Sequence, residues 1–394
     1  MVPDYLTLDD VEVASRRVLV RADLNTPLAG GEVADDFRIR SSLGAIHKLR
    51  SRRAVVVVCS HLGRPEGSDP RLSLAPVARR MQELGGFAVR HLPVMAGLEA
   101  KEAVSRGLPG EVFLLENTRF HPGETSNDPR LADQLAELAD LFCQDAFGSV
   151  HRAHASTVGV AARIRSVAGP LLTSELVSMG TLLENPPRPF VVILGGAKVS
   201  DKLGVLSALV EKCDVLAIGG GMSFTALLAE GYSVGRSLVE ENMMPAIGEL
   251  LRGPHGGKVL LPEDVVAARA FRADAEHRIT AAESIGDDEL GLDIGPAAAA
   301  RFADACWAAG SVFWNGPMGV FEWEAFRSGT ETIARAVTSS GAFSVVGGGD
   351  SAAAVRLLGL EDEVSHLSTG GGAGLRLLEG KALPGVEILK KWVP

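Results

Sequence analysis

A short apolar run, a loop rich in glycine or polar residues, and an amphipathic stretch follow one another repeatedly along this chain. This order is typical of βαβ units, in which helices connect the strands of a parallel sheet. The expected strands cover residues 17–22, 54–59, 111–115 and 141–144 in the first half, and 190–194, 215–218, 258–261, 311–314 and 343–346 in the second. Residues 55–58 are consecutive valines, as expected of a strand buried on both faces. The pattern predicts an α/β fold.

The length of 394 residues favours two domains of this kind. Residues 185–189 read Asn-Pro-Pro-Arg-Pro, and these prolines stop a helix and stiffen the chain. The preceding residues, 170–184, have helical spacing and no internal proline. We therefore expect two Rossmann-like lobes, each a parallel β-sheet flanked by helices, joined by a connecting helix.

Charge and cysteine content argue against several classes of protein. The formal net charge of −10 disfavours nucleic-acid and anionic-membrane partners, which require a broad positive field. Cys59, Cys143, Cys213 and Cys306 form no C-x-x-C pair, so we expect reduced thiols of a cytoplasmic protein. The N-terminus lacks the pattern of a secretory signal, and no apolar stretch reaches about 18 residues, so we expect no membrane span.

Ligands of open parallel sheets bind beyond the carboxyl ends of the strands, so the loops at those ends are informative. The loops that follow the four expected strands of the first half supply these basic residues: Arg38, His61, Arg64, Arg119 and Arg152. Arginine binds two oxygens of a phosphate or carboxylate at once, and Asp23 and Asn25 can bond to hydroxyl groups. The sequence predicts a pocket for a small, hydroxylated molecule with several negative charges.

Taken singly, these residues have simpler interpretations. One loop arginine is usually a solvated charge, and a lone histidine is more often structural than catalytic. Four such loops at one predicted edge favour the pocket. We expect no metal site at His151, Arg152 and His154, because no cysteine or carboxylate stands at ligand spacing.

Glycine loops mark the second half of the chain, at residues 195–196, 219–221, 347–349 and 370–372. Glycine lets the backbone approach a phosphate, and a helix that begins there offers free N–H groups, although such a loop alone is often only a tight turn. Lys198 and Lys202 are four residues apart, so we expect them on one helix face, bridged by an anion. Because the P-loop and dinucleotide motifs are absent, nucleotide binding rests on this constellation, with Asp350 as a candidate Mg²⁺ ligand.

Together these motifs resemble those of the phosphoglycerate kinase family, in the family's order and over essentially the whole chain. The resemblance rests on residues 21–27 (Arg-Ala-Asp-Leu-Asn-Thr-Pro), 60–65, 115–120 and 145–157, and on 195–202, 219–225, 314–323, 347–352 and 368–373. It implies reversible, Mg²⁺-dependent phosphoryl transfer between 1,3-bisphosphoglycerate and ADP, giving 3-phosphoglycerate and ATP in glycolysis. It also implies a monomer whose lobes close on their substrates.

The resemblance implies a phosphoglycerate-binding lobe at 1–169, a connecting helix at 170–186 and a nucleotide-binding lobe at 187–374, with residues 375–394 returning to the first lobe. Phosphoglycerate would be held by Asp23, Asn25, Arg38, His61, Leu62, Gly63, Arg64, Arg119 and Arg152. The nucleotide would be held by Lys198, Lys202, Gly219, Gly291, Leu292, Asn315, Glu322, Gly348, Gly349, Asp350 and Ser351, with Asp350 on the Mg²⁺. The residues acting on the moving phosphoryl group would be Arg38, Lys202, Gly349 and Gly372.

The chain departs from the family pattern in two places. Leu24 and Thr26 replace residues that are more often Phe and Val, and residues 374–376, Gly-Leu-Arg, stand where Ser-Leu-Glu is common. The second change lies in the stretch that couples to lobe movement. Two alternatives remain. A missing dinucleotide motif disfavours an NAD-dependent oxidoreductase, and the filled catalytic positions disfavour a binding protein without activity.

Overall fold

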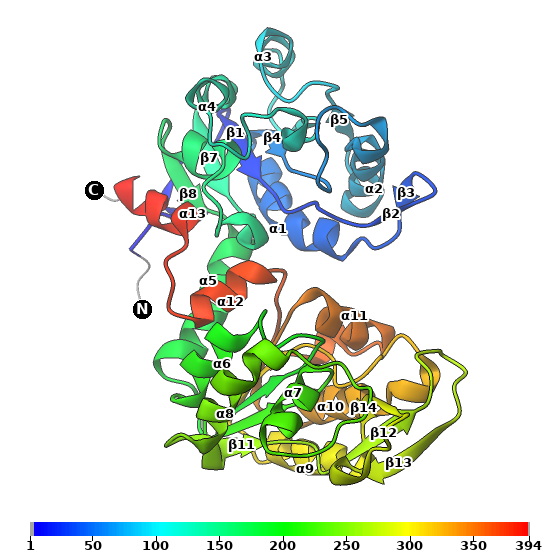
Figure 1. Cartoon of the computed structure of the whole chain (residues 1–394). Helices are drawn as coiled ribbons and strands as arrows, with labels where there is room; N and C mark the ends of the chain where they lie inside the picture. The colour runs from blue at the N-terminus through cyan, green and yellow to red at the C-terminus, as the bar shows by residue number, and fades with distance from the viewer. Residues whose placement is uncertain (1–3, 393–394) are drawn as a thin grey trace. The chain divides into compact units, whose positions relative to one another are not determined.

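The computed structural model describes residues 4–392, which belong to two compact units (Figure 1). Unit 1 comprises residues 1–176 together with 382–394, and unit 2 comprises residues 177–381. Unit 1 is therefore assembled from two separate stretches of the chain.

Unit 1 is built on a parallel sheet with the strand order β5-β6-β4-β1-β7-β8. Its strands are β1 Arg17–Arg21, β4 Val55–Cys59, β5 Val89–His91, β6 Val112–Leu114, β7 Leu141–Gln144 and β8 Ser166–Ala168. A short hairpin of β2 (Leu28–Ala29) and β3 (Glu32–Val33) follows β1. All five residues of β4 are buried, as their apolar sequence predicts.

Helices cover both faces of the sheet in unit 1. Alternate residues of the central strands point to opposite faces, so Val20 and Val56 pack into one core cluster and Leu19 and Val57 into another. The first cluster includes residues of α1 (Phe37–Ser51) and α2 (Ala75–Gly85), and the second includes residues of α3 (Leu98–Ser105) and α4 (Pro129–Ala136). The loops at the carboxyl ends of the strands thus stand on a rigid, three-layered base.

The last described residues complete unit 1. They form α13 (Pro384–Glu387) and a short helical segment, Ile388–Trp392. Lys391 Nζ donates to the carbonyl oxygen of Ala162 and Trp392 Nε1 to that of Ala161, each at 2.8 Å.

Unit 2 also contains a parallel sheet, with the order β11-β10-β9-β15-β16-β17. Its strands are β9 Phe190–Leu194, β10 Val215–Ile218, β11 Val259–Leu260, β15 Ser311–Asn315, β16 Phe343–Gly347 and β17 His366–Leu367. A smaller antiparallel sheet has the order β13-β12-β14, with β12 Asp264–Ala268, β13 His277–Ala281 and β14 Leu290–Ile294.

The helices of unit 2 are α6 Leu203–Val210, α7 Met222–Ala229, α8 Met244–Arg252, α9 Pro296–Trp307, α10 Ser328–Ser339, α11 Gly349–Leu357 and α12 Gly372–Leu378. Four of them, α6, α7, α11 and α12, begin close to the glycine loops. Residues of α9, α10 and α11 pack around the buried side chain of Trp314.

Helix α5 (Pro170–Glu184) crosses the division between the units, which falls after Leu176. The buried carboxylate of Asp145, just after β7, caps its first turn. One oxygen, Oδ1, accepts the N–H groups of Leu171 at 2.8 Å and Leu172 at 3.2 Å. A helix over 170–184 was expected from the spacing, and α5 has these bounds.

Every expected strand is present, with bounds that differ from the prediction by a residue or less at each end. The strands that the sequence did not reveal include β5, β8 and β17, which lie at sheet edges and have two or three residues each. Edge strands are often short, and a run of two or three residues is too brief to show an apolar pattern. The antiparallel sheet of unit 2 was also not predicted.

Candidate functional site

The four basic loops of unit 1 do share one edge of the sheet. Strands β6, β4, β1 and β7 are neighbours and run parallel, so the loops that follow them leave the sheet on the same side. We call the group formed there by Arg38, His61, Arg64, Arg119 and Arg152 the arginine pocket.

The imidazole of His61 shows that the arginines converge. Burial lowers its pKa well below the usual value, and the charges of Arg21, Arg119, Arg152 and Arg38 lower it further. The pKa of the Arg119 guanidinium is lowered too, first by burial and then by its neighbours. Repulsion among confined cations is relieved when an anion enters, so the pocket is built to attract negative charge.

Carboxylate and amide side chains hold the arginine pocket in place. Arg38 Nη1 donates to the buried Asp23 Oδ2 at 2.5 Å, and Asn25 Oδ1 accepts the Gly63 N–H at 2.8 Å. One acceptor oxygen of Asp23 and one of Asn25 are therefore already hydrogen-bonded within the protein. Asn117 is buried and ties three neighbours together: its Oδ1 accepts the N–H groups of Leu62 and Arg119, and its Nδ2 donates to the carbonyl oxygen of Leu72.

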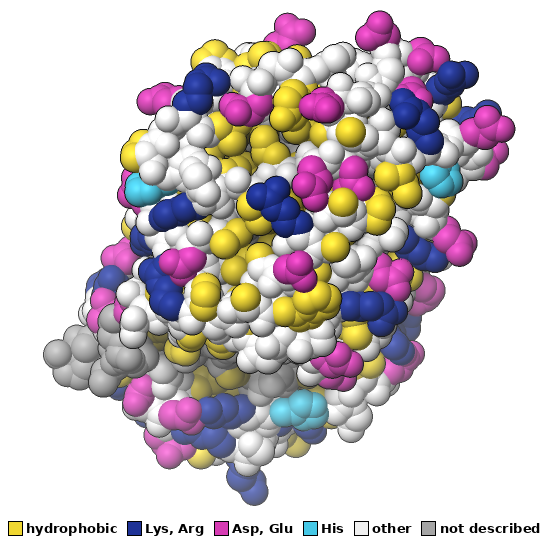
Figure 2. Space-filling model, turned by 90° about the horizontal axis from the view of Figure 1, so that it is seen from below, with side chains coloured by type: hydrophobic (Ala, Val, Ile, Leu, Met, Phe, Trp, Pro, Cys, Tyr) yellow, Lys and Arg dark blue, Asp and Glu magenta, His cyan; other side chains and the backbone are white. Residues whose placement is uncertain are grey.

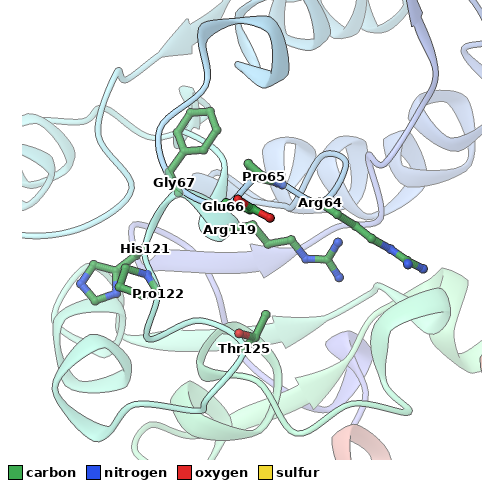
Figure 3. Close-up of a pocket in the computed structure, with 9 residues that line it drawn as sticks. Arg64, Pro65, Glu66, Gly67, Arg119, His121, Pro122 and Thr125 are labelled. Carbon is green, nitrogen blue, oxygen red and sulfur yellow. The ribbon is translucent and has the colours of Figure 1, made fainter.

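A cavity of about 460 Å³ opens beside this group. Figure 3 shows the guanidinium groups of Arg64 and Arg119 extending to the same side of it, while the ring of His121 points the opposite way. Arg119 also donates to the carbonyl oxygen of Gly63, so its position is fixed by the loop that carries Arg64.

Sequence reasoning did not assign Arg21 and Glu124 to the site. Arg21 is the last residue of β1 and is 1% exposed, and its Nη2 lies 3.0 Å from His61 Nδ1. Glu124 is fully buried and accepts the N–H of Ser156 and the hydroxyl protons of Ser156 and Thr118. An arginine at the end of an apolar strand was the available signal for Arg21, whereas nothing in the loop sequence distinguished Glu124.

In unit 2, two of the glycine loops border a second cavity, of about 300 Å³. Gly291, Leu292, Glu322 and Asp350, all expected nucleotide residues, line it together with glycines of the 195–196 and 219–221 loops. The other expected residues lie outside the lining: Lys198, Lys202, Gly219, Asn315, Gly348, Gly349 and Ser351. Of these, Ser351 is tied to the loop after β15, because its Oγ accepts the Gly316 N–H at 2.5 Å.

Lys202 occupies a largely enclosed position. Its Nζ donates to the carbonyl oxygens of Gly195 at 2.5 Å and Asn315 at 2.8 Å. Burial lowers the pKa of the ammonium group to about 8, although the charges of Asp350 and Asp201 act in the opposite direction. An anion beside this group would restore the stability of its charged form.

The prediction that Lys198 and Lys202 share a helix face was wrong. Helix α6 begins at Leu203, with Lys202 as its N-cap, and Lys198 lies exposed in the preceding bend. The glycines there allow close backbone packing: a Cβ at Gly195 would lie 2.2 Å from the carbonyl oxygen of Pro317.

Helices α11 and α12 begin where the sequence placed them, at Gly349 and Gly372. Their N-caps, Gly348 (φ 92°) and Gly371 (φ 45°), have positive φ angles that favour glycine. Asp350 is an exposed residue in the first turn of α11.

Among residues 4–392, no group of three or more His, Cys, Asp or Glu side chains is placed to hold a metal ion. A single exposed carboxylate beside a cavity still fits Mg²⁺, which is usually held by one or two carboxylates, waters and substrate phosphates. Over the same residues, no helix has both the length and the apolar character needed to cross a bilayer.

Comparisons with known proteins identify the family of this chain. The family model for phosphoglycerate kinase matches residues 8–381. The chain is 54% identical to phosphoglycerate kinase of Salinispora arenicola over 395 residues (98% of this chain, 99% of the relative) and 51% identical to that of Moorella thermoacetica over 387 residues (98% of each). The solved phosphoglycerate kinase structure from Coxiella burnetii matches with a TM-score of 0.87 at 40% identity, covering 98% of this chain and 99% of that one. The chain belongs to the phosphoglycerate kinase family.

Proposed function

We propose that the arginine pocket of unit 1 binds the phosphoglycerate and that the glycine-lined cavity of unit 2 binds the nucleotide, in the transfer of a phosphoryl group between 1,3-bisphosphoglycerate and ADP that defines this family. The proposal is carried by the convergence of Arg38, Arg119 and Arg152 on the buried His61. A partly buried cluster of cations without equal counter-charge is costly unless an anion binds there.

Asp23, Asn25 and His61 would bond to the hydroxyl and carboxylate groups of the substrate, and the backbone of Leu62 and Gly63 would line the site. Arg64, Arg119 and Arg152 would hold its phosphate. Several donors of fixed geometry would select a small, compact anion over a longer chain.

In unit 2, the nucleotide would lie in the cavity with Glu322 at its ribose and Gly291 and Leu292 against its base. The remaining contacts, on the phosphates, would come from Lys198, Lys202, Gly219, Asn315, Gly348, Gly349, Asp350 and Ser351.

The chemistry that we propose is direct, in-line transfer without a phosphoenzyme. Phosphoryl transfer depends on alignment and charge stabilisation more than on covalent chemistry, and both reacting oxygens are already anionic at neutral pH, so no general base is needed. Arg38 and Lys202 would stabilise the moving group, with N–H groups at Gly349 and Gly372 as additional donors.

The cation that best fits these residues is Mg²⁺, which would enter bound to the nucleotide and would have Asp350 as its protein ligand. When bound, it would neutralise negative charge on the nucleotide phosphates. Because the two proposed pockets belong to different units, transfer requires the units to close so that the ligands meet and water is excluded. We further propose that the protein acts as a cytoplasmic monomer on small molecules alone.

A coupled assay tests the proposal. The protein is supplied with 3-phosphoglycerate, ATP and Mg²⁺, and 1,3-bisphosphoglycerate formation is followed as NADH consumption through glyceraldehyde-phosphate dehydrogenase. We expect turnover that vanishes when either substrate or Mg²⁺ is omitted. Binding of both ligands without turnover would place a closure defect at residues 374–376. Absence of binding would contradict the proposed pockets.

A further inference from the structure

The side chain of Arg21 uses all three of its nitrogens within unit 1. Nε donates to Ser156 Oγ at 2.9 Å, Nη1 donates to the carbonyl oxygen of Ala22 at 2.5 Å, and Nη2 lies 3.0 Å from His61 Nδ1. A guanidinium group has donors and no acceptor, so Nδ1 of His61 must accept this hydrogen bond. The neutral ring then carries its proton on Nε2.

Ser156 connects Arg21 to a buried carboxylate, that of Glu124, through hydrogen bonds. Its hydroxyl accepts from Arg21, and its own proton is donated to Glu124 Oε1 at 2.5 Å. The Ser156 N–H donates to the other carboxylate oxygen, Oε2, at 3.0 Å. Both partners are fully buried, so neither can exchange these bonds for water, and the direction of each bond is fixed.

His61 is surrounded by charges that oppose its protonation. Burial lowers the pKa of His61 first, and the charges of Arg21, Arg119, Arg152 and Arg38 lower it further. Two carboxylates counter these charges: Asp23, which is paired with Arg38, and Glu124, which is bonded to Ser156. His154 Nδ1 lies 3.8 Å from Glu124 Oε1, the oxygen that accepts the Ser156 hydroxyl proton.

The free donor of the ring is its second nitrogen. Within residues 4–392, His61 makes no hydrogen bond through Nε2. A neutral donor supplies a directed hydrogen bond without adding another positive charge to a pocket that already holds several arginines.

We propose that Ser156 and Glu124 are positioning residues that, through Arg21, fix His61 as a neutral Nε2–H donor aimed at the anionic substrate. This inference deepens the proposed function and rests on it. The chain Glu124–Ser156–Arg21–His61 also joins the end of β1 to the loops after β4, β6 and β7, so a displacement of any one of these loops would alter the donor.

The direct test is the ¹⁵N NMR signature of the His61 ring in the full-length protein without substrate, assigned with His61→Gln. We expect an unprotonated Nδ1 and a protonated Nε2 between about pH 6 and about pH 8. A protonated Nδ1, or a cationic ring, would overturn the proposal in the wild-type protein, whatever the folding of any variant.

We call the hydrogen-bonded chain Glu124–Ser156–Arg21–His61 the relay. Variants distinguish a break in the relay from a general loss of structure. Ser156→Ala removes both of the hydroxyl's bonds, so we expect mixed tautomers and a His61 pKa closer to its usual value. Glu124→Gln should also mix the tautomers, but the loss of its negative charge should lower the His61 pKa further. The matched control is Thr118→Val, which also removes a buried hydroxyl donor to Glu124, at 3.2 Å, but leaves the path to Arg21 intact. An unchanged signature in Ser156→Ala, or the same change in Thr118→Val, would contradict the relay.

Kinetics connect the relay to the substrate. A weakened hydrogen bond to a charged ligand should raise the KM for 3-phosphoglycerate about tenfold in Ser156→Ala, with a smaller change in kcat and none in the KM for ATP. An altered ¹⁵N signature of the His61 ring with an unchanged KM would show that His61 Nε2–H does not contribute to binding of the substrate. If the wild-type protein shows the expected signature but does not bind 3-phosphoglycerate, the substrate assignment fails and the relay stands.

Discussion

Lys202 and Arg64 are held in opposite ways, and the difference predicts opposite kinetic effects. The ammonium group of Lys202 is enclosed and bonded to two backbone carbonyls. Arg64 makes no hydrogen bond from its side chain within the described residues, and it lines the cavity, with its guanidinium group extending to the same side as that of Arg119 (Figure 3). The first group is preorganised, whereas the second is free to follow a ligand.

Lys202→Ala should lower kcat by about 10³-fold or more, because a clamp on the transferring phosphoryl group acts mainly in the transition state. The coupled assay measures this effect, with the exposed Lys212→Ala as the control. A loss below about tenfold would remove Lys202 from the mechanism.

Arg64→Ala should mainly raise the KM for 3-phosphoglycerate, since a flexible cation at the cavity contributes to substrate binding in the ground and transition states alike. We expect an increase of about tenfold to 100-fold, as for one charged hydrogen bond, and little change in kcat. Initial rates over a range of 3-phosphoglycerate give both constants. Arg71, exposed and paired with Asp69, provides the control Arg71→Ala. An unchanged KM would place Arg64 outside the site.

At the scale of elements, the loop after β15 depends on a glycine. Gly316 has φ 101°, and a Cβ there would lie 2.2 Å from the carbonyl oxygen of Gly195 and 2.4 Å from Lys202 Nζ. Gly341, with φ 70°, has open space around the same position. Comparing substitutions at these two glycines therefore distinguishes the cost of a positive φ angle from the cost of a steric clash.

Gly341→Ala should cost about 1 kcal/mol of stability, the cost of a positive φ alone. Gly316→Ala should cost about 3 kcal/mol or more, because the backbone or Lys202 must also move, and it should raise the KM for ATP. Urea denaturation and initial rates measure the two effects. Equal destabilisation by both changes would show that the close contact between a Cβ at position 316 and Lys202 Nζ does not affect the free energy of unfolding.

The cap of α5 makes the stability of unit 1 depend on pH. Burial raises the pKa of Asp145 to about 7. The folded state therefore binds a proton that the unfolded state releases between about pH 4 and about pH 7, and stability falls as the pH rises through that range. Asp145→Asn keeps an oxygen for Leu171 and Leu172 but removes the buried charge.

We expect Asp145→Asn to stabilise the protein by about 1–3 kcal/mol at pH 8 and to change it little at pH 4, where the wild-type carboxyl is protonated. Urea titrations at both values of pH measure the difference. A variant that is less stable than wild type at pH 8 would mean that the ionised carboxylate is the better cap.

The sequence predicted those elements whose signal is local. Long buried strands such as β4 and β9 are visible as apolar runs, and the loops that follow them could be assigned to one edge because parallel strands share a direction. It could not place Glu124, whose importance comes from contacts with Thr118 and Ser156 in separate loops, or show that Lys202 precedes its helix. Short edge strands such as β8 depend on a neighbouring strand that only the fold supplies.

For the whole molecule, surface charge agrees with small-molecule substrates. Figure 2 shows acidic and basic side chains interspersed on the visible face, with hydrophobic side chains between them. The formal net charge is −10. The positive charge of the arginine pocket is therefore local, which suits a compact anion and disfavours an extended polyanion.

Each substrate should protect a different unit from hydrogen exchange. A ligand stabilises the part of the chain that binds it, by about 2.7 kcal/mol at 100 times its Kd. We expect 3-phosphoglycerate to slow exchange mainly within residues 1–176, and ATP with Mg²⁺ mainly within 177–381, as measured by mass spectrometry of peptides. Sulfate at matched ionic strength controls for general salt effects. Protection of unit 1 by ATP alone would contradict the assignment of the pockets.

The two stretches that build unit 1 have a consequence for synthesis on the ribosome. Gly385 N–H donates to the carbonyl oxygen of Val150 at 2.8 Å, and Lys391 and Trp392 bond to residues 162 and 161. All residues of unit 2 leave the exit tunnel before these partners do. Unit 1, although its synthesis begins first, therefore cannot be completed until the residues that follow unit 2 have left the tunnel.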